Sequence, residues 1–373
     1  MLSSLLKRRQ IRSPEPCAIA TAQILRQVVA KARWNDADAL LERVQKVGKR
    51  LVESQPRELT IGNITMRVLG LIRDEADEER NDGDDSQSES VSASEATSEQ
   101  GGYFHPEHSP ELRRLNPARP APLTSFSSFS VPRSLFHILA AEPWDTSESG
   151  WGSGVSSPAR ANAARVHALR SEIIDGIEEI LDEISQVDEQ VAGSAEVQVQ
   201  PGEFILLHQP SRTVTKFILK AAAKRKFSVF LVSQSSGPSA ARDDFKALKE
   251  KLTALGVTVT GVSSSSIRAY MPRVDKVILG ARAVVASGGV LVNAGAGAVA
   301  RAAKAEGKPV VILSGVYKIS PNRGTDPNKI IEWGAASTAV DYTDGKVVDD
   351  VEVKAAISEF VPPELVDIYI TNL

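Results

Sequence analysis

The sequence predicts an α/β protein in which an N-terminal helical domain is followed by a doubly wound, mainly parallel, Rossmann-like sheet domain. Two patterns lead to this fold class. Apolar residues recur at the period of an α-helix within residues 1–75. From residue 203 onward, short β-branched runs alternate with helical runs, which is typical of parallel strands joined by helical crossovers.

The helical part contains three apolar stripes at helical spacing. They lie at residues 24–29, 40–52 and 64–72. Pro56 prevents the second and third stripes from forming one continuous helix, because proline lacks an amide proton and clashes with the preceding turn. We therefore predict a helical domain over residues 1–75. Its basic, leucine-containing start is interpreted as a short first helix, with a weak likeness to a transit peptide as the alternative.

A segment of different composition follows the helical domain. Acidic residues and serines crowd residues 74–99, and prolines recur from residue 106 to residue 132. Such a stretch buries too little apolar surface to offset the entropy lost on ordering, so we predict a disordered insert over residues 76–155. A long amphipathic helix at residues 161–192 then forms most of a linking segment over residues 156–200.

The predicted sheet domain covers residues 201–373. Its strands are expected at 204–207, 227–232, 257–262, 276–279 and 309–313, and its helices at 213–224, 243–255 and 294–305. Ligands of such sheets bind beyond the carboxyl ends of the strands, so a site is expected in the loops that follow them. These loops begin at His208, Ser233, Gly280 and Ser314. The ending at residues 361–373 is compatible with either a helix or a strand.

Charge and composition exclude several classes of protein. The formal net charge is -3 and the pI is near 6.1, whereas a protein that lives mainly on nucleic acid needs a basic face to recruit phosphates. No apolar run reaches the roughly 20 residues of a membrane span. Cys17 is the single cysteine, which fits a reducing compartment. We expect a cytoplasmic protein with no direct nucleic-acid partner and no membrane partner.

One motif superficially matches a dinucleotide fingerprint. Residues 295–300 read G-x-G-x-x-A, but they come late in the sheet domain, and the nearest acid, Glu306, is too close to serve as the ribose-binding residue. We interpret these small residues as a tight contact between helix and sheet, and we expect no cofactor. No His/Cys group has metal-ligand spacing, so no metal site is predicted.

Several runs carry a resemblance to a known family. They are residues 33–63, 211–214 with 221–227, 273–280 and 361–372. Together they resemble the beta (regulatory) subunits of eukaryotic translation initiation factor 2B. The wider family includes the alpha and delta subunits and the methylthioribose-phosphate and ribose-bisphosphate isomerases. The resemblance covers both folded parts and skips the acidic insert, and it implies a further helix beyond Leu373.

The isomerase relatives allow a comparison by residue. They use a cysteine after the first strand and an aspartate in a G-A-D motif. Here Gln209 stands at the first position and Arg282 at the second, and the phosphate-holding Asn-Lys pair is altered to Val292 and Asn293. An amide cannot act as a thiolate, and a guanidinium stays protonated and cannot act as a base. The resemblance therefore implies no catalytic residue.

What remains of the isomerase site is a candidate residual anion pocket. Its expected members are His208, Gln209, Ser211, Arg212, Arg282, Asn293 and Lys318. We interpret His208, at a strand end, as a hydrogen-bonding group rather than an acid or base, because no carboxylate or nucleophile lies near it in the sequence.

The resemblance implies a non-catalytic regulatory subunit of the guanine-nucleotide exchange factor for translation initiation factor 2. Such a subunit contributes to assembly and to sensing of the phosphorylated substrate, while catalysis lies in another subunit. The expected partners are homologous delta and alpha subunits, the gamma and epsilon catalytic subunits, and the alpha subunit of initiation factor 2. The alternative is a sugar-phosphate (aldose–ketose) isomerase or a metabolite-binding relative.

Overall fold

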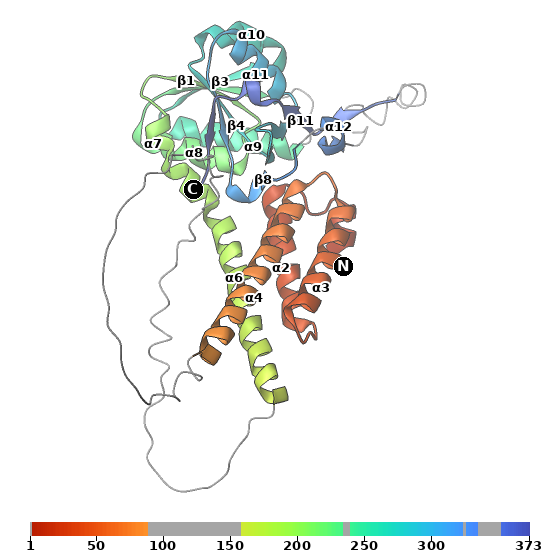
Figure 1. The fold of residues 1–373 in the computed structure, drawn as a ribbon. Helices are drawn as coiled ribbons and strands as arrows, with labels where there is room; N and C mark the ends of the chain where they lie inside the picture. The colour runs from red at the N-terminus through yellow and green to blue at the C-terminus, as the bar shows by residue number, and fades with distance from the viewer. Residues whose placement is uncertain (1, 89–157, 234–238, 324–325, 335–351) are drawn as a thin grey trace, which may run out of the picture. The chain divides into compact units, whose positions relative to one another are not determined.

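The structure, a computed structural model, describes residues 2–88, 158–233, 239–323, 326–334 and 352–373 (Figure 1). Most of the predicted insert lies outside these residues, so its disorder stays a prediction. The described residues up to Asp84 and from Ala159 onward belong to one compact unit.

Helices form the N-terminal part of this unit and the link to the sheet. They are α1 (Leu2–Lys7), α2 (Pro14–Lys31), α3 (Ala37–Ser54), α4 (Leu59–Ser88), α6 (Pro158–Gly193) and α7 (Ala195–Gln198). Pro14 starts α2, where a missing amide proton removes no helical bond. Asp36 caps α3 by accepting a hydrogen bond from the Ala39 amide at 2.7 Å. Pro56 separates α3 from α4, as its chemistry predicts.

Helix α4 extends beyond the boundary that composition suggested. The helical domain was expected to end at residue 75, whereas α4 continues to Ser88. The added residues include Glu, Ala and Arg, which are good helix formers. Propagating an existing helix is also much easier than starting one. The change from apolar to acidic residues therefore does not mark the end of the helix.

The main sheet has six parallel strands in the order β12-β7-β4-β1-β2-β3. The strands are β1 (Phe204–His208), β2 (Ser228–Ser233), β3 (Thr258–Ser263), β4 (Lys276–Gly280), β7 (Val310–Leu313) and β12 (Ile368–Ile370). The helical connections are α8 (Arg212–Lys224), α9 (Ser239–Ala254), η1 (Ser264–Ser266), α10 (Ile267–Tyr270), η2 (Met271–Arg273) and α11 (Ala296–Ala305). The predicted α/β fold class is confirmed, and β12 shows that the ambiguous ending contains a strand.

The strands send alternate side chains into two cores on opposite faces of the sheet. Ile205 and Leu207 of β1 pack into a core that includes α8, α9 and the helices α2, α3, α4 and α6. Leu206, which lies between them, packs into a second core with α10 and α11. Figure 1 shows α8 and α9 on one side of the sheet and α10 and α11 on the other. Because the first core continues from the N-terminal helices into the sheet, both parts are held by the same apolar packing.

The sequence did not predict a second sheet, which has the strand order β11-β6-β5-β8. Its strands are β5 (Ala283–Val285), β6 (Val290–Asn293), β8 (Ile319–Ser320) and β11 (Ser358–Val361). Strands of two to four residues are too short for their periodicity to be recognised. The remaining elements are η3 (Val316–Lys318), α12 (Pro327–Ile330), β9 (Trp333–Gly334), β10 (Ala355–Ala356) and η6 (Pro363–Leu365).

The packing of α3 on α4 leads to a testable prediction. A Cβ added to Gly48 would lie 2.1 Å from Thr65 Cγ2, whereas a Cβ on Gly70 would meet no atom within 4 Å. We expect Gly48→Ala to lower the free energy of unfolding by about 1–3 kcal/mol through overpacking. The matched control Gly70→Ala should raise it by up to about 1 kcal/mol through helix propensity. Urea denaturation measures both, and equal effects of the two substitutions would contradict this packing.

Candidate functional site

The predicted site residues lie at the carboxyl ends of the strands, as expected for a doubly wound sheet. His208 is the last residue of β1, and Ser211 caps the following helix α8 by accepting a hydrogen bond from the Val214 amide at 3.4 Å. Asn293 ends β6, and Lys318 ends η3 after β7. Five of the seven predicted residues fall into three groups with different chemistry, while Ser211 serves as the cap of α8 and Lys318 is buried nearby.

The first group contains His208, Gln209 and Asn293. Gln209 has φ = 42°, in the left-handed region, and its side-chain amide donates to the Ala294 carbonyl at 3.4 Å. Asn293 Nδ2 donates to the Gln209 carbonyl at 3.2 Å. The Gln209 amide is therefore part of a hydrogen-bond network that holds the backbone after β1.

The His208 ring is enclosed by the protein. Its side chain is 3% exposed, and Nδ1 is buried without a hydrogen-bond partner. Nε2 lies 2.9 Å from where a Cβ on Gly295 would stand, and Gly295 has φ = 95°. Burial lowers the pKa of His208 to about 4. The imidazole is therefore neutral near pH 7 and carries no charge to hold an anion.

The second group centres on Arg212. Its guanidinium lies 2.8 Å from Glu15 Oε1 of α2 and 3.2 Å from Asp188 Oδ2 of α6. The other Asp188 oxygen accepts a 2.7 Å hydrogen bond from the Thr213 hydroxyl. These contacts join α8 to both α2 and α6.

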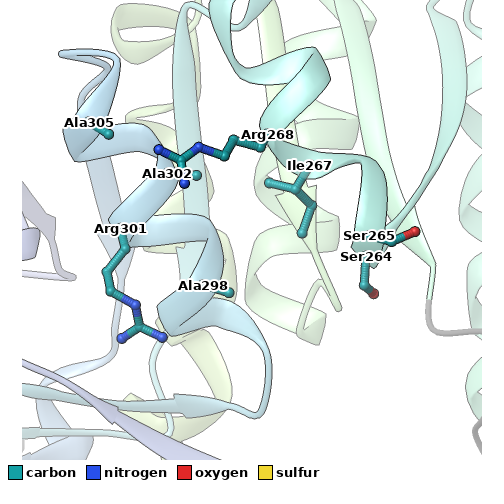
Figure 2. Close-up of a pocket in the computed structure, with 8 residues that line it drawn as sticks. All are labelled: Ser264, Ser265, Ile267, Arg268, Ala298, Arg301, Ala302 and Ala305. Atoms are coloured by element: carbon teal, nitrogen blue, oxygen red, sulfur yellow. The ribbon is translucent and has the colours of Figure 1, made fainter.

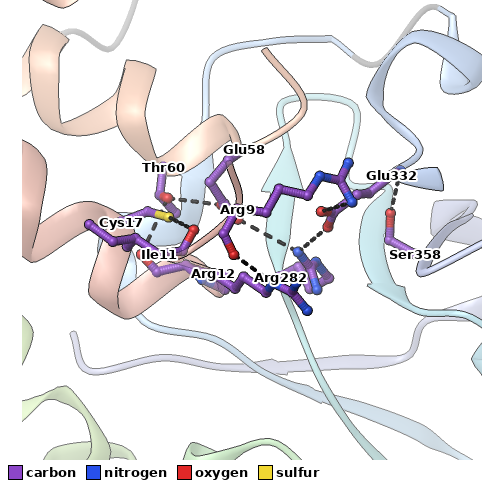
Figure 3. Close-up of polar contacts among 10 residues, drawn as sticks. Arg9, Ile11, Arg12, Cys17, Glu58, Thr60, Arg282, Glu332 and Ser358 are labelled. Carbon is purple, nitrogen blue, oxygen red and sulfur yellow. Dashed lines mark hydrogen bonds and ion pairs between the residues drawn. The ribbon is translucent and has the colours of Figure 1, made fainter. Parts of the chain in front are cut away.

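The third group, which we name the Arg282 cluster, consists of Arg9, Glu58, Arg282 and Glu332 (Figure 3). Arg282 Nη2 lies 2.6 Å from Glu332 Oε2 and 3.6 Å from Glu58 Oε2. Arg9 Nη1 lies 3.1 Å from Glu332 Oε1, and the Thr60 hydroxyl donates to Glu58 Oε1 at 2.9 Å. Burial raises the pKa of Glu58, whereas Arg282 lowers it. The guanidinium thus neutralises two carboxylates that the fold has largely removed from water.

Two further buried groups lie close to this cluster. Lys318 is 4% exposed, with its ammonium 5.4 Å from the centre of the Tyr317 ring. Burial lowers its pKa, while the charges of Asp188, Glu15 and Glu58 raise it. Cys17, buried in α2, has its pKa raised to about 12 by burial and then by Glu58. This thiol is unreactive at neutral pH.

The site as a whole is balanced by its own charges. Its cations are Arg9, Arg212, Lys216, Arg282 and Lys318, and its carboxylates are Glu15, Glu58, Asp188, Glu189 and Glu332. An anion has to compete with these carboxylates for the two arginines. Anion binding by the predicted pocket therefore stays a prediction, and the contacts themselves fasten the N-terminal helices to the carboxyl end of the sheet.

None of the acidic partners in this site was predicted from the sequence. Glu15, Glu58 and Glu332 come from segments far from the strand ends, and nothing in their local sequence marks them. For Asp188 the sequence did contain a sign of burial, because Asp188 follows Ile184 by four residues on the apolar stripe of α6. In the structure it is 6% exposed. A buried acid on an apolar helix face requires a partner.

The start of α11 also has its own carboxylate. Glu359 of β11 accepts a hydrogen bond from the Gly297 amide. An exposed helix N-terminus attracts anions, but here a protein side chain occupies that position in the G-x-G-x-x-A motif. This geometry agrees with reading the motif as a packing feature. Among the described residues, no group of His, Cys, Asp and Glu side chains is arranged to hold a metal ion.

None of the described helices is long and apolar enough to cross a membrane. Over residues 10–373 the chain matches the Initiation factor 2 subunit family, and it belongs to that family. Within it, the chain is 32% identical over 370 residues to the translation initiation factor eIF2B subunit beta of Schizosaccharomyces pombe, which covers 99% of this chain and 89% of the relative.

Two solved structures are also similar. One is eIF2B beta from Chaetomium thermophilum, with 38% identity, a TM-score of 0.67, and coverage of 100% of this chain and 85% of that chain. The other is the tetrameric eIF2B-beta2-delta2 complex of C. thermophilum, with 38% identity, a TM-score of 0.63, and coverage of 100% and 87%. The resemblance seen in the sequence is thus confirmed at the level of the family.

The Arg282 cluster leads to a prediction about stability. Arg282→Met leaves Glu58 and Glu332 buried without their shared cation, and we expect it to lower the free energy of unfolding by about 3–5 kcal/mol. The control Arg26→Met removes an exposed pair with Glu178 and should cost no more than about 1 kcal/mol. Adding Glu58→Gln to Arg282→Met should recover part of the loss, and chemical denaturation of the parent chain, of each single variant including Glu58→Gln, and of the double variant measures this. Additive effects of the two substitutions would contradict the coupling.

His208 leads to a prediction about pH. The folded-state pKa of about 4 lies below the ordinary value of about 6.5, so the unfolded chain binds the proton more readily, and stability falls as the pH drops through this window. From this residue we expect a loss of about 2 kcal/mol between pH 7.5 and pH 5. His208→Gln should remove that part of the pH dependence, as measured by urea denaturation at the two pH values. An unchanged pH dependence in the variant would show that folding does not lower the pKa of His208.

Proposed function

We propose that this chain is a cytoplasmic, non-catalytic regulatory subunit of the beta type in the guanine-nucleotide exchange factor for translation initiation factor 2. In this role it contributes to assembly of the factor and to sensing of the phosphorylated substrate. Its partners are delta-type and alpha-type homologues, the gamma and epsilon catalytic subunits, and the alpha subunit of initiation factor 2. Membership of the Initiation factor 2 subunit family supports this role.

The observation that carries the non-catalytic part is the engagement of Arg282. An isomerase of this fold needs a base at that position and a thiolate near Gln209. Arg282 instead bridges two buried carboxylates, and the Gln209 side chain donates to the backbone. No proton acceptor of suitable pKa stands at either position. These contacts favour a scaffold that uses the former site for internal cohesion.

The similarity to a beta2-delta2 tetramer of C. thermophilum along the whole chain supports pairing with a delta-type subunit. We expect co-expression of this chain with the delta-type subunit of the same organism to yield a heteromer with two copies of each subunit. Size-exclusion chromatography with light scattering measures the mass. A beta-type chain that stays monomeric beside a soluble delta-type chain would contradict the proposed assembly role.

A nucleotide-exchange assay tests the sensing role. Assemblies reconstituted with and without this chain are compared on phosphorylated and unphosphorylated initiation factor 2. We expect the complete assembly to be inhibited by the phosphorylated form, and the assembly without this chain to lose that discrimination. Equal discrimination by both assemblies would remove the sensing role while leaving the assembly role intact.

An enzymatic assay separates the proposal from the isomerase alternative. We expect no turnover of ribose 1,5-bisphosphate or methylthioribose 1-phosphate by the purified chain. Turnover that is lost in Gln209→Ala would establish an isomerase instead.

A further inference from the structure

The first 58 residues of the chain differ in charge from the rest. They contain twelve arginines and lysines and six aspartates and glutamates, whereas the whole chain has a formal net charge of -3. Three of the six acids are already engaged within the protein, where they pair with arginines of the sheet domain or cap α3, and these are Glu15, Glu58 and Asp36. This part of the chain therefore presents an excess of positive charge to solvent.

Helix α3 carries much of this charge on its solvent-facing side. Arg43, Lys46 and Arg50 are all exposed, and their spacing of i, i+3 and i+7 places them on one face of the helix. The opposite face packs into the protein through Leu40, Val44, Gly48 and Leu51. We name the three exposed cations the α3 ridge.

The α3 ridge has no ionic partner within the part of the chain that the structure describes. None of its three cations has a carboxylate within 4 Å or a side-chain hydrogen bond. Glu42 and Glu53 flank the ridge along the same helix, but neither pairs with it. On a helix face that serves only as a solvated surface, charges of both signs typically alternate, whereas the ridge presents one sign.

Arginines in the sheet domain are arranged differently. Arg212 and Arg282, at the carboxyl end of the sheet, are each held by two carboxylates. Arg268 and Arg301 line a groove between α10 and α11, but their side chains extend in different directions (Figure 2). Arg301 also stands beside the Glu359 carboxylate. The α3 ridge differs from both places, because its cations are aligned and uncompensated.

We propose that the α3 ridge docks an acidic helix of a partner protein, whose carboxylates recur at i, i+3 and i+7 and face the three cations. Complementary charges of this kind steer association and fix the register of the two surfaces. Arg43 and Arg50 can each donate two parallel hydrogen bonds to a carboxylate, because the guanidinium group is a planar fork. The inference rests on the charges of α3 and holds whether or not the chain has the proposed regulatory role.

A polypeptide fits this surface better than a nucleic acid does. Trp34 is the single aromatic residue among residues 2–58 and is 5% exposed, so the surface offers no platform on which bases stack. Glu42 and Glu53 also repel a uniformly anionic polymer, whereas a partner helix can place basic side chains opposite them.

Fluorescence anisotropy with a labelled peptide tests the docking on the full chain. The probe is an alanine-based helical peptide whose three glutamates are spaced i, i+3 and i+7. We expect saturable binding that weakens as the salt concentration rises, because exposed ion pairs are screened. The triple variant Arg43→Gln, Lys46→Gln, Arg50→Gln should weaken this binding about tenfold, since each exposed pair contributes a modest factor. Circular dichroism establishes that the variant is folded.

A matched variant and a matched peptide make the test specific. Lys220→Gln, Lys226→Gln and Lys249→Gln together remove the same number of exposed positive charges from the sheet domain, and this variant should bind the probe as the parent chain does. A peptide of the same composition with its three glutamates adjacent should bind less tightly than the probe. No saturable binding, equal weakening by the two triple variants, or equal affinity for the two peptides would overturn the proposal.

Two further measurements separate the acidic helix from other occupants. Tighter binding of a single-stranded oligouridylate than of the probe, lost in the ridge variant, would assign the ridge to nucleic acid. Light scattering of the chain alone should show a mass that is the same for the parent chain and the ridge variant. A larger mass that requires the intact ridge would show that a second copy supplies the acids. Either result would overturn docking of a separate partner.

Discussion

The alternation of side chains along the buried parallel strands is the constraint on which the rest of the structure depends. Each central strand has to cover both of its faces with apolar partners, because both faces are removed from water. On one face α10 and α11 share the core with η2, β6 and β11. On the other face α8 and α9 share the core with α2, α3, α4 and α6. The N-terminal helices are therefore part of the covering of the sheet, and their position determines which polar residues meet its carboxyl end.

That shared core explains why so many charges are buried at the junction. Glu15 of α2, Asp188 of α6 and Glu58, which directly precedes α4, reach the strand ends because these helices turn their apolar stripes toward one core. Once there, each acid requires a cation, because an unpaired buried carboxylate is strongly destabilising. Arg212 and Arg282 supply that cation. The charge pairs make the docking of helices on sheet specific, while the apolar contacts supply most of the stabilisation.

The sequence predicted the main fold because long apolar patterns report directly on burial. The five strands from β1 to β7 in the main sheet, and helices α8, α9 and α11, were located because their patterns are long or are bounded by glycine, as at Gly256. The second sheet was missed because β5, β6, β8 and β11 are too short to show alternation. The position of the site was also predictable, since parallel strands place their carboxyl ends at one edge. Its charge balance was not predictable, because ion pairs such as Arg282–Glu58 join residues through tertiary packing and leave no local pattern.

The Arg282 cluster also limits how this chain can change over generations. An isomerase-like aspartate at position 282 would place a third carboxylate against Glu58 and Glu332, and like charges at such distances disfavour the folded state. A single substitution of Arg282 by aspartate is therefore opposed by both neighbouring carboxylates. The Arg282 cluster therefore accepts an acid at position 282 only after the surrounding acids have been replaced.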